Sequence, residues 1–241
     1  MEHSSVPAES SKNVERAQRI LDVAADLLLR WGYKRVTIDD IARHAGVGKG
    51  TIYLHWKTRD SLFETVILRE MIAIYRAILR RMYADTTEIL PHRLLRSSLL
   101  ITEGNPIIKA LLTRDIEAVG KLIQSNANSE IRNREELALR KYFSLLYRHG
   151  LTAVDINQPE HLYALEMLTT SFTMIDPYIV SGQQLSLEQK AEVLTRIIRQ
   201  TFEPSTPPSP TALQEVAPAA IQLFEQLCLD FEQKIRTQTE M

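Results

Sequence analysis

The sequence predicts an all-α fold, in which a small N-terminal domain of three helices is joined to a larger helical bundle. Apolar residues recur at helical spacing along most of the 241-residue chain, and no run alternates in the way a strand does. A glycine-centred turn near residue 46 joins two short helices, which is the pattern of a helix-turn-helix. We expect a disordered tail over 1–12, the helix-turn-helix domain over 13–58 and the helical bundle over 59–241.

The first helix is expected over residues 14–31. Asn13 is a candidate N-cap, and Gly32 can take the left-handed backbone that commonly ends a helix. The apolar face of this helix is formed by Ile20, Ala24, Leu27, Leu28 and Trp31.

Two short helices follow, over 38–45 and 49–55. Thr37 and Asp40 have the spacing of a capping box, with Asp in place of the usual Glu or Gln. Gly46 supplies the positive φ that a tight turn between the two helices requires. Ile52 is the residue of the second short helix that points to the core, so the rest of that helix faces outward.

Eight further helices are expected in the bundle. The segment 204–210, PSTPPSP, is predicted to be an extended linker because it is rich in proline. Pro218 is expected to kink the last helix. The predicted ranges are 60–83, 92–103, 106–113, 115–126, 129–149, 160–181, 187–202 and 211–236.

The outward face of the helix over 49–55 suits the major groove of DNA. Lysine and threonine side chains can donate to base edges or phosphates, and a glycine allows close approach. Tyrosine and histidine can bond to phosphate oxygens, and the start of a helix also favours a phosphate. The candidate DNA contacts are Thr37, Lys49, Gly50, Thr51, Tyr53, Leu54, His55 and Lys57.

Other interpretations of this glycine-rich stretch are weaker. A nucleotide-binding P-loop needs a different glycine spacing after a buried strand, whereas this segment follows a helix. The other histidines show no metal-ligand spacing relative to His55. Packing is an alternative to phosphate contact for His55 and Tyr53, and it is the expected role of Trp56.

The bulk composition limits the classes of function. Net charge is −1, but residues 12–60 hold ten Lys or Arg against six Asp or Glu, so a basic module is joined to an acidic body. The single cysteine, Cys228, fits a reducing compartment, and no apolar run is long enough to span a membrane. Neither a catalytic motif nor a metal-site motif is present, so we expect a cytoplasmic protein that is not an enzyme and has no cofactor or metal.

The segment VTIDDIARHAGVGKGTIYLHWKTRDSLF, residues 36–63, closely resembles the DNA-binding segment of TetR/AcrR-type transcriptional regulators. The resemblance extends back to about residue 14. It implies that Thr37, Tyr53, His55 and Lys57 contact the DNA backbone, and that Lys49, Gly50, Thr51 and Leu54 lie at or near the bases. The chain departs from the family pattern at Gly48, where serine is common, and at Leu54 and Trp56, so the base preference is open.

The resemblance further implies a helical domain that dimerises through a four-helix bundle and holds a ligand pocket. The alternative for each of these side chains is ordinary core packing. Candidates to line a pocket are Met71, Ile74, Tyr75, Ile78, Arg114, Tyr142, Phe143 and Leu146. Candidates for the dimer interface are Leu165, Phe172, Leu194, Ile197 and Ile198.

The expected function is that of a homodimeric regulator, a repressor that binds a palindromic double-stranded DNA operator and is released by a small-molecule effector. Two helix-turn-helix domains of a dimer engage successive major grooves about 34–36 Å apart. The alternative is a helical DNA-associated or interaction protein without a small-molecule effector. The sequence does not identify the effector, the operator or the role of the helix after residue 210.

Overall fold

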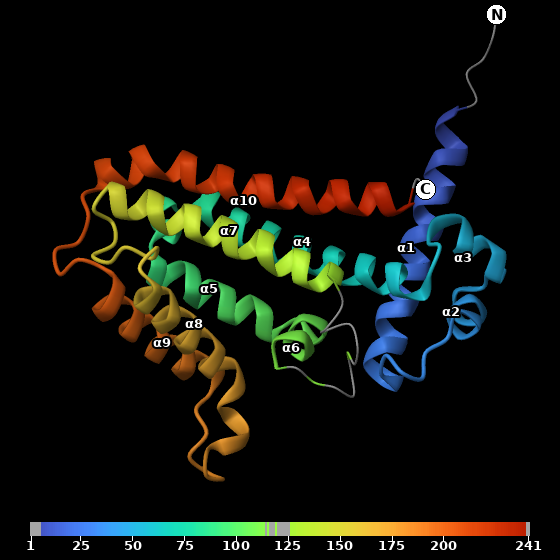
Figure 1. The fold of residues 1–241 in the computed structure, drawn as a ribbon, viewed down its shortest axis with the longest axis horizontal. Helices are drawn as coiled ribbons and strands as arrows, with labels where there is room; N and C mark the ends of the chain where they lie inside the picture. The colour runs from blue at the N-terminus through green and yellow to red at the C-terminus, as the bar shows by residue number, and fades with distance from the viewer. Residues whose placement is uncertain (1–5, 114, 116–118, 120–125, 240–241) are drawn as a thin grey trace, which may run out of the picture.

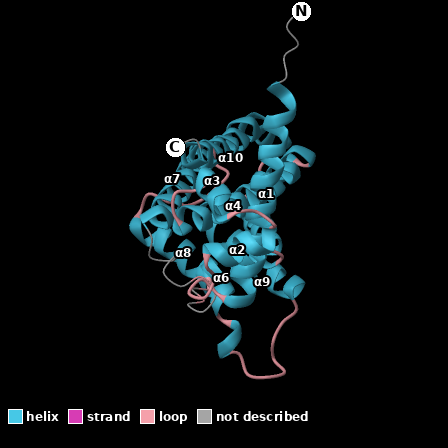
Figure 2. Cartoon of the chain, turned by 90° about the vertical axis from the view of Figure 1, so that its right-hand side faces the viewer, coloured by secondary structure: helices cyan, strands magenta, loops and turns pink. Residues whose placement is uncertain are grey.

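The fold was obtained as a computed structural model, which describes residues 6–113, 115, 119 and 126–239. Every regular element among these residues is a helix, as Figure 2 shows. The elements are α1 (Val6–Trp31), α2 (Ile38–Ala45), α3 (Lys49–His55), α4 (Arg59–Ala84), the 3-10 helix η1 (Thr86–Ile89), α5 (Pro91–Glu103), α6 (Pro106–Leu112), α7 (Asn126–Arg148), α8 (Pro159–Met174), the 3-10 helix η3 (Asp176–Tyr178), α9 (Leu187–Phe202) and α10 (Pro210–Thr239).

Helices α1–α3 pack around the start of α4, and the remaining helices form a bundle along the rest of α4 (Figure 1). The long helix α10 lies along α4 and α7 and also contacts α3. Helix α9 packs on α5, and the α8–α9 hairpin extends away from the bundle on the side opposite α10. Helix α4 is therefore the element that the N-terminal domain and the bundle share.

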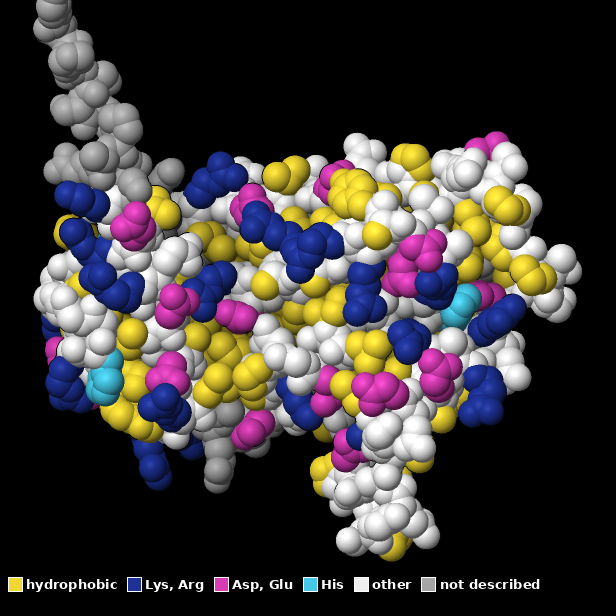
Figure 3. Space-filling model, turned by 180° about the vertical axis from the view of Figure 1, so that it is seen from behind, with side chains coloured by type: hydrophobic (Ala, Val, Ile, Leu, Met, Phe, Trp, Pro, Cys, Tyr) yellow, Lys and Arg dark blue, Asp and Glu magenta, His cyan; other side chains and the backbone are white. Residues whose placement is uncertain are grey.

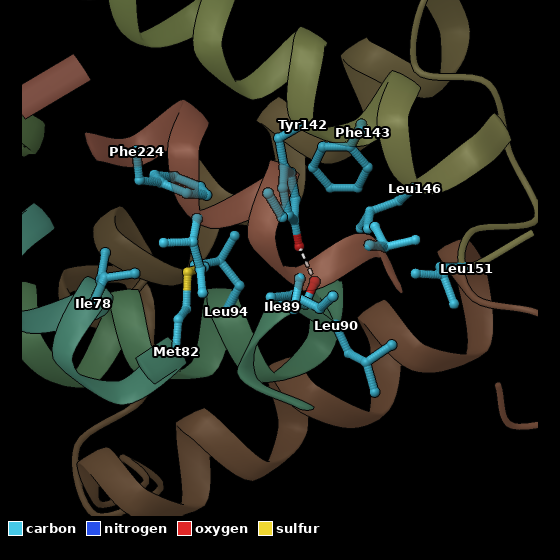
Figure 4. Close-up of a cluster of buried hydrophobic side chains, with 14 of the residues drawn as sticks. Ile78, Met82, Ile89, Leu90, Leu94, Tyr142, Phe143, Leu146, Leu151 and Phe224 are labelled. Carbon is cyan, nitrogen blue, oxygen red and sulfur yellow. Dashed lines mark hydrogen bonds between the residues drawn. The ribbon is translucent and has the colours of Figure 1, made fainter. Parts of the chain in front are cut away.

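The buried apolar side chains of the described residues form two clusters that meet along α4. The first cluster joins α1–α3 to the first half of α4, and it is closed by Leu227 and Phe231 of α10. The second cluster fills the bundle around Tyr142, Phe143 and Phe224 (Figure 4). Because fully burying one such side chain contributes about 1.5–3 kcal/mol, each cluster is large enough to fix the helices that it joins.

The end of α10 bonds directly to the start of α4. Gln238 Nε2 donates to Glu64 Oε2 at 2.9 Å, and the Thr65 hydroxyl lies 3.2 Å from Gln238 Oε1. Helix α10 thus belongs to both parts of the molecule, which the sequence did not indicate.

The predicted helices over 38–45, 49–55, 60–83, 92–103, 106–113 and 187–202 are confirmed within two residues at each end. Helix α7 begins three residues earlier than predicted, and α10 ends three residues later. Helix α1 begins at Val6, so Asn13 is not its N-cap and the predicted tail is partly helical. The helix expected over 160–181 ends at Met174, because Pro177 disfavours helical backbone in the residue before it and lacks the N–H that a helix would use. Helix α10 continues through Pro218.

The helix expected over 115–126 falls mainly outside the described residues. Across the part of the chain that the structure does describe, no helix has the length and apolar character needed to cross a membrane.

Candidate nucleic-acid interface and internal cavity

Local hydrogen bonds fix the turn that joins α2 and α3. The Thr37 hydroxyl accepts from the Asp40 N–H at 3.2 Å, and the Asp40 carboxylate accepts from the Thr37 N–H at 3.2 Å, which forms the predicted capping box. Gly46 ends α2 with φ +65°, a backbone conformation that other residues rarely adopt. The Val47 N–H then donates to the Ala42 carbonyl at 3.0 Å. The turn geometry that the sequence predicted is confirmed.

Two buried side chains hold α3 in place. Ile52 and Trp56 are 0% and 1% exposed, and the Trp56 N–H donates to the Ile52 carbonyl at 2.9 Å. The Trp56 indole Nε1 also donates to Thr65 Oγ1 of α4 at 2.9 Å. Trp56 is therefore a core residue, as expected, and it ties the end of α3 to α4.

The opposite face of α3 is exposed. Leu54 is 78% exposed and Tyr53 is 45% exposed. Lys49, Gly50 and Lys57 are exposed as well, whereas Thr51 is half-buried. Apart from its two chain neighbours and the backbone of its own helix, no atom lies within 4 Å of the position that a Cβ would occupy at Gly50, so this point of the helix is open to close approach. The structure thus brings the predicted α3 residues together on one surface.

Lys49 has an acidic partner on the neighbouring helix. Its Nζ lies 3.0 Å from Asp39 Oδ2, and the side chains are 50% and 67% exposed. Such exposed ion pairs are weak, because water and salt screen them. Lys49 can therefore exchange Asp39 for a DNA phosphate or base at little cost.

His55 is half-buried, and its ring centroid lies 5.3 Å from that of Trp56. Burial lowers the pKa of His55, and the positive charge of Arg16 lowers it further. The imidazole is consequently neutral near pH 7. A neutral ring can donate one hydrogen bond to a phosphate oxygen, but it adds no positive charge to this surface.

Basic side chains lie at the end of the molecule that carries α1–α3, at the left of Figure 3, and others are spread over the rest of this face. Two of them also brace the domain, which the sequence did not reveal. Arg19 Nε donates to the Ala45 carbonyl at 3.0 Å. Arg59 donates to the Val36 carbonyl at 3.0 Å. The guanidinium of Arg59 also lies 4.2 Å from the centre of the Tyr33 ring.

A cavity of about 230 Å³ lies between α4, α5, α6 and α7. Its wall is mainly apolar, with polar groups from Ser98, Thr102, Arg132 and Glu135. The four residues of α4 predicted to line a pocket, Met71, Ile74, Tyr75 and Ile78, all lie in this wall. The cavity thus touches the helix that leaves the N-terminal domain.

Three of the predicted pocket residues lie elsewhere. Tyr142, Phe143 and Leu146 are each 0% exposed and pack in the core of the bundle, as Figure 4 shows. The Tyr142 hydroxyl donates to the Ile89 carbonyl at 2.5 Å. These side chains come later on α7 than the segment that lines the cavity, so the prediction is wrong for them. Arg114 lies outside the described residues.

A half-buried acid at the cavity wall is the main feature that sequence reasoning missed. Glu135 Oε1 accepts a hydrogen bond from the Tyr75 hydroxyl at 2.5 Å. Burial raises the pKa of Glu135 to about 7. The helical spacing of Glu135 indicates its position. Glu135 follows Ile131 by four residues and precedes Tyr142 by seven, so it lies on the apolar face of α7.

A second cavity of about 180 Å³ lies on the other side of α5, between α5, α6, α8 and α9. It shares Ser98, Thr102 and Leu112 with the first cavity. Phe172 and Leu194, which the sequence assigned to a dimer interface, line this second cavity.

The residues predicted for the dimer interface are mostly internal. Leu165, Leu194 and Ile198 are 1%, 2% and 0% exposed within the single chain, and Ile197 is half-buried. Side chains that pack inward offer no area to a second copy, so these three are corrected to core residues. The exposed apolar side chains of α8 are instead Tyr163 and Met167.

No group of three or more potential metal ligands occurs within the described ranges.

Residues 20–66 match the family model of bacterial regulatory proteins of the tetR family. The HTH-type transcriptional regulator YhgD of Bacillus subtilis is 40% identical over 62 residues, which are 24% of this chain and 32% of the relative. The nucleoid occlusion factor SlmA of Glaesserella parasuis is 28% identical over 109 residues, which are 45% of this chain and 53% of the relative. The chain thus matches only about a third to a half of the length of these relatives.

Solved structures share the fold over most of the chain. A tetR-family transcriptional regulator from Streptomyces coelicolor has a TM-score of 0.51 at 18% identity and covers 93% of this chain and 90% of its own. A transcriptional regulator from Saccharomonospora viridis, solved in complex with choline, has a TM-score of 0.54 at 19% identity and covers 79% of this chain and 99% of its own. At this identity the likeness concerns the fold alone.

Proposed function

We propose, from the match of residues 20–66 to the tetR-family model, that this protein is a transcriptional regulator that binds a palindromic operator as a homodimer and is released by a small-molecule effector. The observation that carries the DNA-binding part is the exposed face of α3. Tyr53 and Leu54 project from a helix that Ile52 and Trp56 hold against the domain core, and the exposed Lys57 follows directly after it.

The assignment of contacts follows from the chemistry of each side chain. Lys57, two residues after the end of α3, supplies charge for a phosphate, and the Tyr53 hydroxyl supplies a hydrogen bond. Lys49, Gly50, Thr51 and Leu54 lie where bases of the major groove would be read. Thr37 contacts the DNA backbone at the exposed start of α2. Its hydroxyl takes part in the capping box with Asp40.

Release by an effector is supported by the position of the 230 Å³ cavity. Its wall includes Met71 and Tyr75 of α4, and α4 starts at the DNA-binding domain. A ligand that fits better when α4 is tilted would change the spacing of the two domains in a dimer. A differential affinity of about 1–3 kcal/mol between the two states gives a 5- to 150-fold effect.

Dimerisation is supported by apolar side chains exposed on α8 and after it. Tyr163, Met167 and Tyr178 are 70%, 50% and 81% exposed. Two copies that pair through this face of the α8–α9 hairpin would cover these side chains in a two-fold interface.

The test is a selection of genomic DNA fragments by the purified protein, followed by binding measurements on the recovered sites. The proposal expects a palindromic site, a protein dimer in the complex, and at least one compound that weakens binding. A site without two-fold symmetry, or a monomer on DNA, would contradict it.

A second candidate is a DNA-associated protein without an effector. It is favoured by the similarity to a nucleoid occlusion factor, which extends over more of this chain than the similarity to YhgD. In that case no compound that binds the cavity changes the affinity for DNA.

A further inference from the structure

The cavity between α4 and α7 contains a carboxyl group with few partners. Glu135 projects from α7 into a wall that is otherwise built mainly from isoleucine, leucine and methionine side chains. Tyr75 of α4 donates its hydroxyl hydrogen to Oε1 at 2.5 Å. Among the described residues this is the only hydrogen bond to the Glu135 carboxylate, and none of their basic side chains forms an ion pair with it.

The nearest positive charge does not neutralise Glu135. Arg132 lies on the same helix and also lines the cavity, but its side chain is exposed to solvent. Its charge lowers the pKa of Glu135, yet burial dominates and holds that pKa near 7. A buried carboxylate without a counter-ion is costly, and such a group in a pocket commonly marks a binding site.

A ligand reduces this cost most if it brings positive charge. A neutral ligand can only donate hydrogen bonds to the carboxylate, and an anion would repel it. An ammonium group offers both charge and hydrogen-bond donors, and it can also lie near the face of an aromatic ring such as Tyr75. The apolar wall formed by residues such as Ile74, Ile78 and Leu111 then accommodates a hydrocarbon body.

We propose that the effector is an organic cation, an amine or ammonium compound with a small apolar body, and that Glu135 is its counter-ion. This inference rests on the proposed function, because it names the ligand class of the effector cavity. The cation would compete with Tyr75 for the carboxylate, and so it would loosen the link between α4 and α7.

Three probes of similar size and different charge test the proposal. These are 2-phenylethylamine, 2-phenylethanol and 3-phenylpropanoate, each titrated calorimetrically into the full chain at pH 8. We expect the amine to bind about tenfold or more tightly than the alcohol, and the propanoate to bind least.

Two variants locate the site. Glu135→Gln keeps an oxygen that accepts the Tyr75 hydrogen bond but removes the charge, so it should abolish the preference for the amine. Glu136→Gln is the matched control, because the Glu136 side chain forms a surface ion pair with Arg140 at 2.9 Å. The control should retain the preference. Circular dichroism of both variants shows whether they are folded.

Equal binding of the alcohol and the amine would overturn the proposal. An undiminished preference for the amine in Glu135→Gln would also overturn it, as would a failure of the folded protein to bind the amine at millimolar concentration. Operator binding is measured separately with each probe. If the amine binds through Glu135 but leaves DNA affinity unchanged, the cation site stands and the effector role fails. If the neutral probe releases DNA, the effector role stands and the cation class fails.

Discussion

The indole of Trp56 and the hydroxyl of Thr65 form a buried hydrogen bond that joins the residue directly after α3 to α4. The distance from Nε1 to Oγ1 is 2.9 Å, and the two side chains are 1% and 0% exposed. This bond connects the candidate DNA-binding helix to the helix that borders the 230 Å³ cavity, so its loss should affect both stability and the proposed DNA binding.

Thr65→Val should lower the free energy of unfolding by about 1–3 kcal/mol, because the Trp56 N–H would be left buried without an acceptor. Urea denaturation followed by circular dichroism measures this change. Thr195→Val is the control, since the Thr195 hydroxyl also bonds to a carbonyl four residues earlier but accepts from no indole. A similar loss in both variants would show that the indole bond has no special role.

Lys57→Ala should weaken binding to all DNA sequences alike and reduce the slope of log K against log salt by about one, because one phosphate contact is lost. Fluorescence anisotropy over a range of salt concentrations measures both. Tyr53→Phe should weaken binding without the change in slope, since it removes a hydrogen bond but no charge. Lys141→Ala, an exposed change on α7, serves as the control. If the slope of log K against log salt is unchanged in Lys57→Ala, Lys57 does not contact a phosphate.

Glu135 should make the protein less stable as pH rises. Burial raises its pKa from an ordinary value of 4.5 to about 7, so the folded state binds this proton more tightly than the unfolded state does. The penalty is absent below pH 4.5, grows as pH rises, and is complete above pH 7 at about 3 kcal/mol. The titratable groups around it are Tyr75 on α4, Arg132 on α7 and Cys228 on α10, which faces Tyr75.

Glu135→Gln should therefore be more stable than the natural chain at pH 8 by up to about 3 kcal/mol, and equally stable near pH 4.5. Thermal unfolding at several pH values measures the difference. Glu136→Gln should show no such trend. Parallel pH profiles for the natural chain and Glu135→Gln would mean that the carboxylate is adequately solvated in the folded protein.

Met167→Arg should convert a dimer into a monomer if α8 forms the interface, because a charge would be buried between two copies. Sedimentation velocity measures the mass in solution. Leu229→Arg places the same charge on α10, where Leu229 is 52% exposed, and should leave the dimer intact. A dimer that persists in Met167→Arg would exclude this face of α8.

Phe231→Ala should destabilise the N-terminal domain although it lies at the far end of the sequence. Phe231 is 0% exposed in the cluster that holds α1–α3, and truncating such a side chain costs about 3–5 kcal/mol. Hydrogen exchange of the α1–α3 amides measures the effect by region. Leu229→Ala, in an exposed position, is the control. Unchanged exchange in α1–α3 would show that the domain does not depend on α10.

The local parts of the fold were predictable because they depend on short-range chemistry. The capping box of Thr37 and Asp40, the left-handed Gly46 and the exposed face of α3 all follow from residues close in sequence. The α4 side of the cavity was predictable for the same reason, since Met71, Ile74, Tyr75 and Ile78 lie on one face of one helix.

The remaining parts depend on how distant helices pack, which helical periodicity does not encode. Tyr142 and Leu165 lie on apolar stripes, and such a stripe looks the same whether it faces a cavity, the core or a second chain. Glu135 was missed because a glutamate in a charged helix is ordinarily a surface residue. Only its contact with Tyr75, 60 residues away in sequence, reveals its position.

The placement of α10 has a consequence for how the molecule is made. Helices α1–α3 leave the ribosome early, but the cluster that supports them includes Leu227 and Phe231, which are synthesised more than 150 residues later. We therefore expect the N-terminal domain of α1–α3 to remain loosely packed on the nascent chain and to reach full stability only when α10 docks. If this domain binds DNA as proposed, it would acquire that ability at the end of translation rather than during it.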